Sequence, residues 1–201
     1  MVAVEEAHAF GRKVMSHAQG REGIENSILA GVDSIEHGFC LDEELVDMML
    51  KRGVFFVPTL VAGRRIVEHA DEVGIPDYAQ KKAEAFIHQH REAFHLAHQK
   101  GVQIAMGTDA GTPYNMHGQN ASEITLMVQA GMKPEDALDS ATRMASDLMG
   151  MRSRVGTLAT GLEADLVAVS GDFLDDVSVL ECPDNILMVM KQGRIIKERE
   201  V

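Results

Sequence analysis

The sequence predicts an α/β fold in which short parallel strands alternate with helices, followed by a small antiparallel sheet. The main observation is that a glycine ends an amphipathic stretch four times and a short apolar run then follows, at Gly11, Gly31, Gly53 and Gly101. A glycine just past a helix supplies the left-handed residue that ends it. Short apolar runs rich in Val, Ile and Phe are typical of buried strands. A second observation is that β-type patterns replace this alternation from Val155 onward.

The elements of the first part follow in order along the chain. The four predicted strands are the runs RKVMSHA, VDSIEHG, VFFVPTL and VQIAMGTDAG. Helices are predicted over residues 21–30, 42–52, 76–100, 119–130 and 134–149. Asp42 is the expected N-cap of the second helix, and Pro134 fits the first turn of the last, where its missing N–H costs nothing. Strands and helices alternating at this spacing indicate parallel βα units.

The segment 61–78 is longer than a minimal connection between a strand and a helix. We interpret it as an insertion at the carboxyl end of the third strand, which is the face where barrel enzymes keep their active sites. An insertion there is expected to form a lid. In the tail, the runs LMVMK and RIIKE flank Gln192 and Gly193, a pattern typical of a tight hairpin. The predicted boundary separates residues 1–152 from residues 153–201.

Charge and composition narrow the class of protein. The chain has 201 residues and a formal net charge of -12, which disfavours nucleic acid as a partner because its phosphates would be repelled. No apolar run approaches the roughly 20 residues that span a bilayer, and the N-terminus lacks a signal-peptide pattern. The two cysteines, Cys40 and Cys182, form no paired motif and are expected to be free thiols in the cytoplasm.

Three residues that could bind a metal end three of the predicted strands. His17 ends VMSH, His37 ends SIEH and Asp109 ends AMGTD. Because the carboxyl ends of parallel strands open onto one face, two imidazoles and a carboxylate are expected at one rim. These are ligands suited to zinc or a similar divalent metal. A lone strand-end histidine is more often a structural residue, so the pattern by itself leaves a metal site and a structural role both open.

The motifs SHAQG, SIEHG and GTDAG, in this order and spacing, resemble the fifth, sixth and eighth strands of the amidohydrolase superfamily barrel. VFFVPTL is similar to the seventh strand, and GTPYNMHGQNASEITLMVQAGMKPEDALDSATRMASDLMG resembles the branch with imidazolonepropionase-like proteins and metal-dependent Xaa-Pro or Xaa-Arg dipeptidases. The resemblance implies an α/β fold made of a partial (β/α)8 barrel, strands five to eight, followed by a small antiparallel β-sandwich segment.

The resemblance also implies roles for individual residues. His17, His37 and Asp109 would bind a divalent metal, zinc first, and Asp109 would be the catalytic proton-transfer residue. His117, in the loop after the last barrel strand, would face the substrate, although a solvated loop histidine is an equal alternative. Arg64, or Tyr78, could contact a terminal carboxylate of the substrate.

The implied function is metal-dependent hydrolysis of amide C–N bonds, with dipeptides as the first substrate class and a cyclic-amide hydrolase or deaminase as the alternative. The chain departs from the family pattern because it contains neither the His-x-His pair of strand one nor the carboxylated lysine of strand four. We therefore expect an incomplete site, an isolated chain without activity, and association as a homo-oligomer or with the missing barrel half. A catalytically incomplete fragment or interaction module is the alternative from another class.

Overall fold

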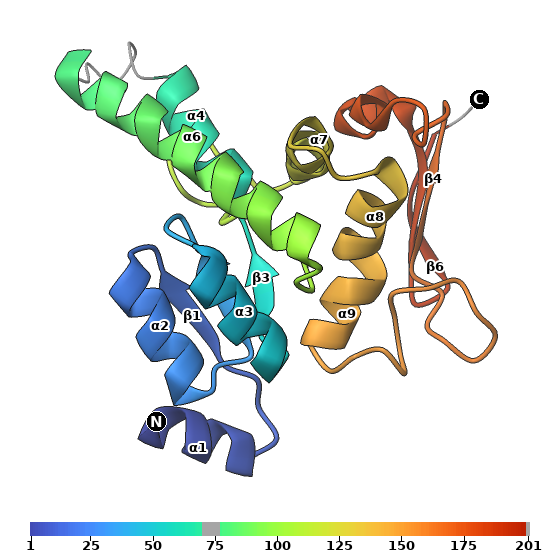
Figure 1. Cartoon of the computed structure of the whole chain (residues 1–201). Helices are drawn as coiled ribbons and strands as arrows, with labels where there is room; N and C mark the ends of the chain where they lie inside the picture. Colours follow the sequence, from blue (N-terminus) through green and yellow to red (C-terminus); the bar gives the residue numbers. More distant parts are fainter. Residues whose placement is uncertain (70–76, 200–201) are drawn as a thin grey trace.

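Helices and strands alternate through the first hundred residues, as the glycine pattern predicts (Figure 1). The computed structural model describes residues 1–69 and 77–199. The first sheet consists of β1 Met15–Ala18, β2 Ser34–His37 and β3 Phe55–Val57. The helices around it and after it are α1 Val2–Ala9, α2 Arg21–Ala30, α3 Glu43–Arg52, α4 Leu60–Glu68, α6 Asp77–Lys100, α7 Ala121–Gln129, α8 Pro134–Asp139 and α9 Ala145–Leu148.

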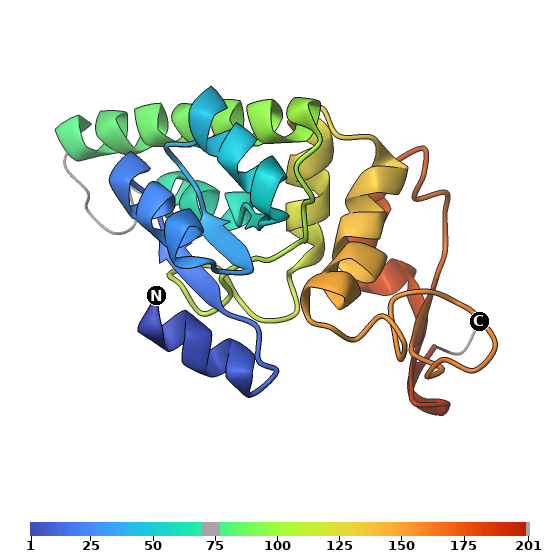
Figure 2. The ribbon, with the colours of Figure 1, turned by 60° about the horizontal axis from the view of Figure 1, so that its bottom comes forward.

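The first sheet is parallel, with the strands in chain order β1-β2-β3. Two of its connecting helices end as the sequence predicts, at Gly31 with φ 89° and Gly53 with φ 66°. Asp42 caps α3 by accepting a hydrogen bond from the Leu45 N–H at 2.9 Å. Ile24 and Ile28 of α2 are fully buried. The predicted βα units are therefore confirmed, and their helices cover the sheet (Figures 1 and 2).

The prediction of a fourth full strand is not confirmed for the described residues. Only an isolated parallel bridge joins Phe56 to Ile104. The Phe56 N–H donates to the Gln103 carbonyl at 2.9 Å, and the Ala105 N–H donates to the Phe56 carbonyl at 3.0 Å. The ladder does not continue beyond this point, because the residue two positions after Phe56 is Pro58, which has no N–H to donate to the Ala105 carbonyl.

The segment interpreted as an insertion begins with a helix, α4, that the sequence analysis did not predict. Residues 70–76 of that segment lie outside the described residues. Helix α6 follows with 24 residues and buries Ala93, Phe94 and Ala97. It packs against α4 and α3, as both ribbon views show. Across residues 1–69 and 77–199, no helix combines the length and the apolar character needed to cross a membrane.

The helix predicted over 134–149 is divided by a π-helical turn, η1 Ser140–Met144, between α8 and α9. Pro134 occupies the first turn of α8 as predicted. Two hydroxyl groups bond back to the preceding turn: Ser140 Oγ donates to the Ala137 carbonyl at 2.6 Å, and Thr142 Oγ1 donates to the Leu138 carbonyl at 2.8 Å. Such back-bonding competes with the regular helical ladder and accounts for the irregular turn.

The tail forms one antiparallel sheet in the order β4-β5-β6, at the far side of α8 and α9 from the first sheet (Figure 1). Its hairpin turn has positive φ at both Gln192, 50°, and Gly193, 76°, as a type I′ turn requires. A second layer is absent from the described part of the chain, so the predicted sandwich is not confirmed. The tail elements are β4 Leu166–Val169, η2 Val177–Glu181, η3 Pro183–Asn185, β5 Ile186–Lys191 and β6 Arg194–Glu198.

Candidate metal centre

Two of the three predicted metal ligands lie side by side at the carboxyl ends of neighbouring strands. His17 is in β1 and His37 is the last residue of β2, where it pairs in register with Ala18. Their ring centroids are 4.5 Å apart, with the rings at 68° to each other. Parallel strands place their carboxyl ends at one edge of the sheet. The structure therefore brings together the imidazole pair that the sequence predicts.

The backbone at His37 bends sharply, with φ 72°, a conformation that side chains other than glycine rarely adopt. β2 ends at this bend, and the His37 side chain is only 7% exposed. His37 Nδ1 lies 2.7 Å from Thr59 Oγ1, at the end of the next strand. Burial lowers the pKa of His37 and the nearby His17 lowers it further, while Asp109 opposes both effects. The ring is therefore held neutral near pH 7, which is the form that binds a metal.

Asp109 follows the fourth apolar run and also has a left-handed backbone, with φ 54°. Its negative charge raises the pKa of both His37 and Glu36, so it lies close to the imidazole pair. Even so, no group of three or more His, Cys, Asp or Glu side chains converges on one metal position within the described ranges. The structure thus brings His17 and His37 together and leaves Asp109 nearby without closing a three-ligand set.

The donor chemistry of the pair fits a divalent metal. Two neutral imidazoles are preferred ligands of zinc, and a carboxylate can serve as a further ligand or as a proton acceptor. In this chain, His17 and His37 would supply the nitrogen ligands and Asp109 the carboxylate. The remaining positions around such a metal would need ligands other than these three residues.

Glu36 is a buried carboxyl group next to the pair that the sequence analysis missed. It is 7% exposed and accepts a hydrogen bond from Ser34 Oγ at 2.5 Å. Burial raises its pKa, the Ser34 bond lowers it, and the charge of Asp109 raises it again. Glu36 stands opposite His17 in the sheet register. Strand alternation places such a register pair on the same face, so the pattern SIEH contained the signal.

A second missed carboxyl group, Glu123, lies inside the protein at the start of α4. Its side chain is fully buried and accepts hydrogen bonds from the N–H groups of Leu60 and Val61, both at 2.8 Å. Burial raises the pKa of Glu123 to about 8, against the effect of the two hydrogen bonds. Glu123 and Met127 are one turn apart in α7 and are both fully buried. A charged residue on the apolar face of the predicted helix was the available signal.

His90 of α6 is the third buried group that the sequence analysis missed. It is 2% exposed and its ring stacks on Phe39 with centroids 4.0 Å apart. Burial lowers the pKa of His90 to about 4, which the nearby carbonyls of His37 and Pro58 only partly oppose. Its Nε2 has no hydrogen-bond partner among the described residues. His90 therefore lies on the buried face of α6 and not on its solvated face.

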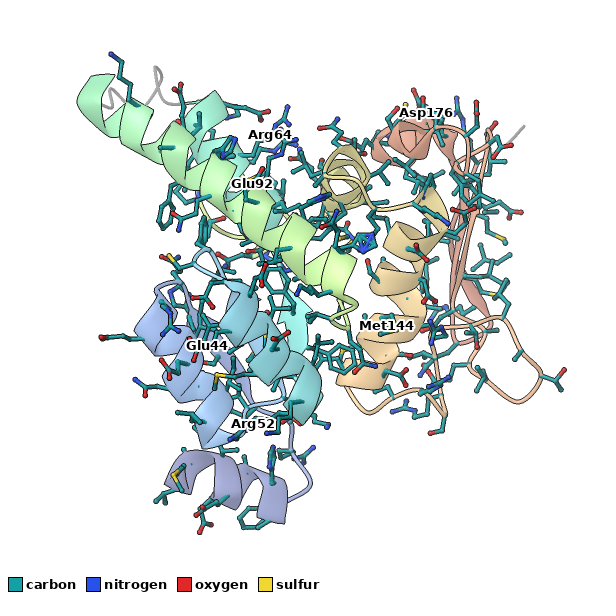
Figure 3. All side chains as sticks on the ribbon, in the orientation of Figure 1. Glu44, Arg52, Arg64, Glu92, Met144 and Asp176 are labelled. Atoms are coloured by element: carbon teal, nitrogen blue, oxygen red, sulfur yellow. The ribbon has the colours of Figure 1, made fainter. Side chains whose placement is uncertain are left out.

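The residues predicted to contact the substrate come from the loops and helices around the strand ends. His117 is exposed in the loop after the fourth apolar run. Arg64 pairs with Glu68 at 2.6 Å and lies beside α6 (Figure 3). Arg65 pairs with the same carboxylate at 3.1 Å and lines a cavity of about 610 Å³ together with residues of α7 and the loop before it. The side chain of Tyr78 lies outside the described residues.

Comparison with known proteins decides the family. The model of the amidohydrolase family matches residues 1–196. This chain belongs to the amidohydrolase family. It is 33% identical to ochratoxinase from Aspergillus niger over 201 aligned positions, covering 98% of this chain and 40% of ochratoxinase. The expectation of superfamily membership is thereby confirmed, on a match that includes both histidines of the imidazole pair.

Solved amidohydrolase structures share the fold. The crystal structure of a Xaa-Pro dipeptidase with methionine bound in its active site is 39% identical, with a TM-score of 0.85 over 96% of this chain and 47% of that one. The crystal structure of ochratoxinase from A. niger is 32% identical, with a TM-score of 0.85 over 100% of this chain and 45% of that one. The chain therefore spans less than half the length of these relatives.

Proposed function

We propose that this chain carries the His17–His37 part of the active site of a metal-dependent amidohydrolase that cleaves amide C–N bonds, with dipeptides as the substrate class. The observation that carries the proposal is the pair of imidazole rings 4.5 Å apart at the carboxyl ends of β1 and β2. Family membership supports hydrolysis of a C–N bond. The dipeptidase among the similar solved structures supports the substrate class.

Each residue of the site has a chemical role in this proposal. His17 and His37 present neutral nitrogen donors, and burial keeps His37 in that form. A divalent metal bound there, with zinc our first choice, would polarise the substrate carbonyl and lower the pKa of water toward neutrality. Asp109 accepts the proton of the attacking water, because a carboxylate close to the reacting water is suited to general-base catalysis. His117 is proposed to contact the substrate from the adjacent loop.

The partner of the chain is part of the proposal. An apolar cavity of about 350 Å³ lies on the sheet and α9, lined by residues that include Met15, Val57, Met106 and Met149. Met15 is 69% exposed and Met149 is 57% exposed. Burying such side chains is favourable at about 25 cal/mol per Å². We propose that the remaining half of the barrel, or a second copy of the chain, covers this face and contributes the missing ligands.

The catalytically incomplete fragment is the second candidate, and one observation favours it. The described residues hold only two converging imidazoles and no group of three metal donors. A two-ligand site binds zinc weakly, since structural and catalytic zinc sites use three or four protein ligands. In this case the chain would hold little metal by itself and would cleave no dipeptide until a partner completed the site.

Zinc binding tests the proposal directly. We expect the wild-type chain to bind zinc in a competition titration, and His17→Ala and His37→Ala each to weaken binding by at least about tenfold. His88→Ala is the control, because His88 lies on the exposed side of α6. Equal zinc affinity in all four proteins would contradict a site at the imidazole pair. Hydrolysis of Xaa-Pro and Xaa-Arg dipeptides with added zinc, together with the mass in gel filtration, separates an active assembly from an inactive fragment.

A further inference from the structure

The carboxyl end of β3 has an unusual backbone at Thr59. This residue adopts φ 55° and ψ 43°, in the left-handed region, just before α4 begins. A β-branched side chain is strongly disfavoured there, because its Cβ approaches the backbone carbonyl. Such a conformation persists only when surrounding contacts hold it in place. The contacts around Thr59 therefore indicate what the conformation achieves.

Glu123 supplies one set of those contacts from another helix. Its carboxyl oxygens accept the N–H groups of Leu60 and Val61, each at 2.8 Å, and these are the two residues that follow Thr59. The first N–H groups of a helix have no partner within the helix. Here the cap comes from α7, 62 residues away from Val61, and the Glu123 side chain is fully buried. The carboxyl group of Glu123 in α7 therefore holds the first turn of α4 in place.

The Thr59 side chain connects this capped turn to His37. Thr59 is 4% exposed, and its Oγ1 lies 2.7 Å from His37 Nδ1. In this left-handed conformation Thr59 connects β3 to α4, and its side chain reaches His37 at the end of β2. When a histidine binds a metal through one ring nitrogen, the hydrogen bond of the other nitrogen fixes the tautomer and the ring orientation.

We infer that Thr59, held in its left-handed conformation by Glu123, is a positioning residue that keeps His37 in the Nδ1–H tautomer and so leaves the Nε2 lone pair free for a metal. In this arrangement the His37 Nδ1–H donates to Thr59 Oγ1. The inference rests on the proposed metal site, but the hydrogen bond and the tautomer are properties of the metal-free chain. Thr59 and Glu123, which are not metal ligands themselves, would thus determine which ring nitrogen His37 presents to the metal.

The first test is a long-range ¹H–¹⁵N spectrum of the His37 ring in the metal-free chain at pH 7.5. We expect the Nδ1–H tautomer in the wild type and in Thr59→Ser, which keeps the hydroxyl. In Thr59→Val, which has the same shape without the hydroxyl, the ring should shift toward Nε2–H. Thr142→Val is the control, because it removes a hydroxyl bond of 2.8 Å in the π-helical turn. A wild-type ring in the Nε2–H form would overturn the inference without any variant.

Zinc affinity gives the second readout. Thr59→Val should weaken zinc binding by about 10- to 100-fold and Glu123→Gln by a smaller factor in the same direction, while Thr59→Ser and Thr142→Val stay close to the wild type. If the wild type binds no zinc, the proposed function fails, but the tautomer experiment still decides the role of Thr59. Unchanged tautomer and affinity in folded Thr59→Val would refute the inference.

Discussion

Glu123→Gln tests how a buried carboxyl group shapes the stability of the fold. Burial raises the pKa of Glu123 to about 8 from 4.5, so between these values the folded chain binds a proton that the unfolded chain has released. The free energy of unfolding therefore falls as pH rises through this window. The full loss is about 5 kcal/mol above pH 8, since each unit of pKa difference corresponds to about 1.4 kcal/mol.

Glutamine at position 123 does not ionise, so it removes this pH dependence. It destabilises the fold in another way, through a lost hydrogen bond. Its oxygen can accept one of the two N–H groups of α4, while its NH2 group faces the other. An unsatisfied buried donor costs about 1–3 kcal/mol at every pH. We therefore expect the wild type to be more stable at pH 5 by about 1–3 kcal/mol. At pH 9 the order should reverse, with Glu123→Gln more stable by about 2–4 kcal/mol, because the ionisation cost of the wild type exceeds the lost hydrogen bond.

Urea unfolding followed by circular dichroism at pH 5, 7 and 9 measures both proteins. Asp42→Asn is the control, because Asp42 caps α3 at the protein surface. Burial raises the pKa of Asp42, but hydrogen bonds from Leu45 and Arg21 bring it below its usual value, so this residue stays ionised throughout that range. A stability difference between wild type and Glu123→Gln that is the same at pH 5 and pH 9 would refute the reasoning.

Two further predictions follow from buried positions. The pKa of His90 is lowered from 6.5 to about 4, so the unfolded chain binds the extra proton, and stability should fall by about 3 kcal/mol as pH drops from 6.5 to 4. His90→Phe should remove this fall in stability at low pH in the same urea titrations. An equally large fall in the variant would show that His90 is not its cause. Gly38→Ala should destabilise by about 2–4 kcal/mol, because the new Cβ would lie 2.6 Å from the Phe56 ring at φ 57°. Gly101→Ala, at φ 83° with open space around it, should cost only about 1 kcal/mol in thermal unfolding, and equal costs at the two glycines would exclude the ring contact as the cause.

The sequence predicted the local alternation of the fold well, because glycine and capping residues act within one turn of the chain. Gly31, Gly53 and Asp42 end or begin helices through their own backbone and side-chain geometry. The fourth strand could not be predicted in the same way. Its run is apolar, but its pairing with β3 ends where Pro58, just after β3, has no N–H to donate to the Ala105 carbonyl. A pairing between positions 47 residues apart leaves no pattern within the fourth run itself.

The candidate site was predictable where chemistry and periodicity coincide. His17 and His37 end apolar runs, and strand polarity then places them together. Thr59 and Glu123 were missed because their roles depend on contacts between β3, α4 and α7, which only the folded chain brings together. His90 was missed for the same reason, since the pattern of α6 does not reveal that its ring stacks on Phe39.

Three of the left-handed residues, His37, Thr59 and Asp109, lie at equivalent places, each at or just after the end of an apolar run. At each of them, glycine would relieve the backbone by about 1–2 kcal/mol and would also remove the side chain that the proposed site uses. Selection for stability and selection for activity therefore act in opposite directions at these positions. We therefore expect glycine at these positions to relieve backbone strain while it weakens the proposed metal site.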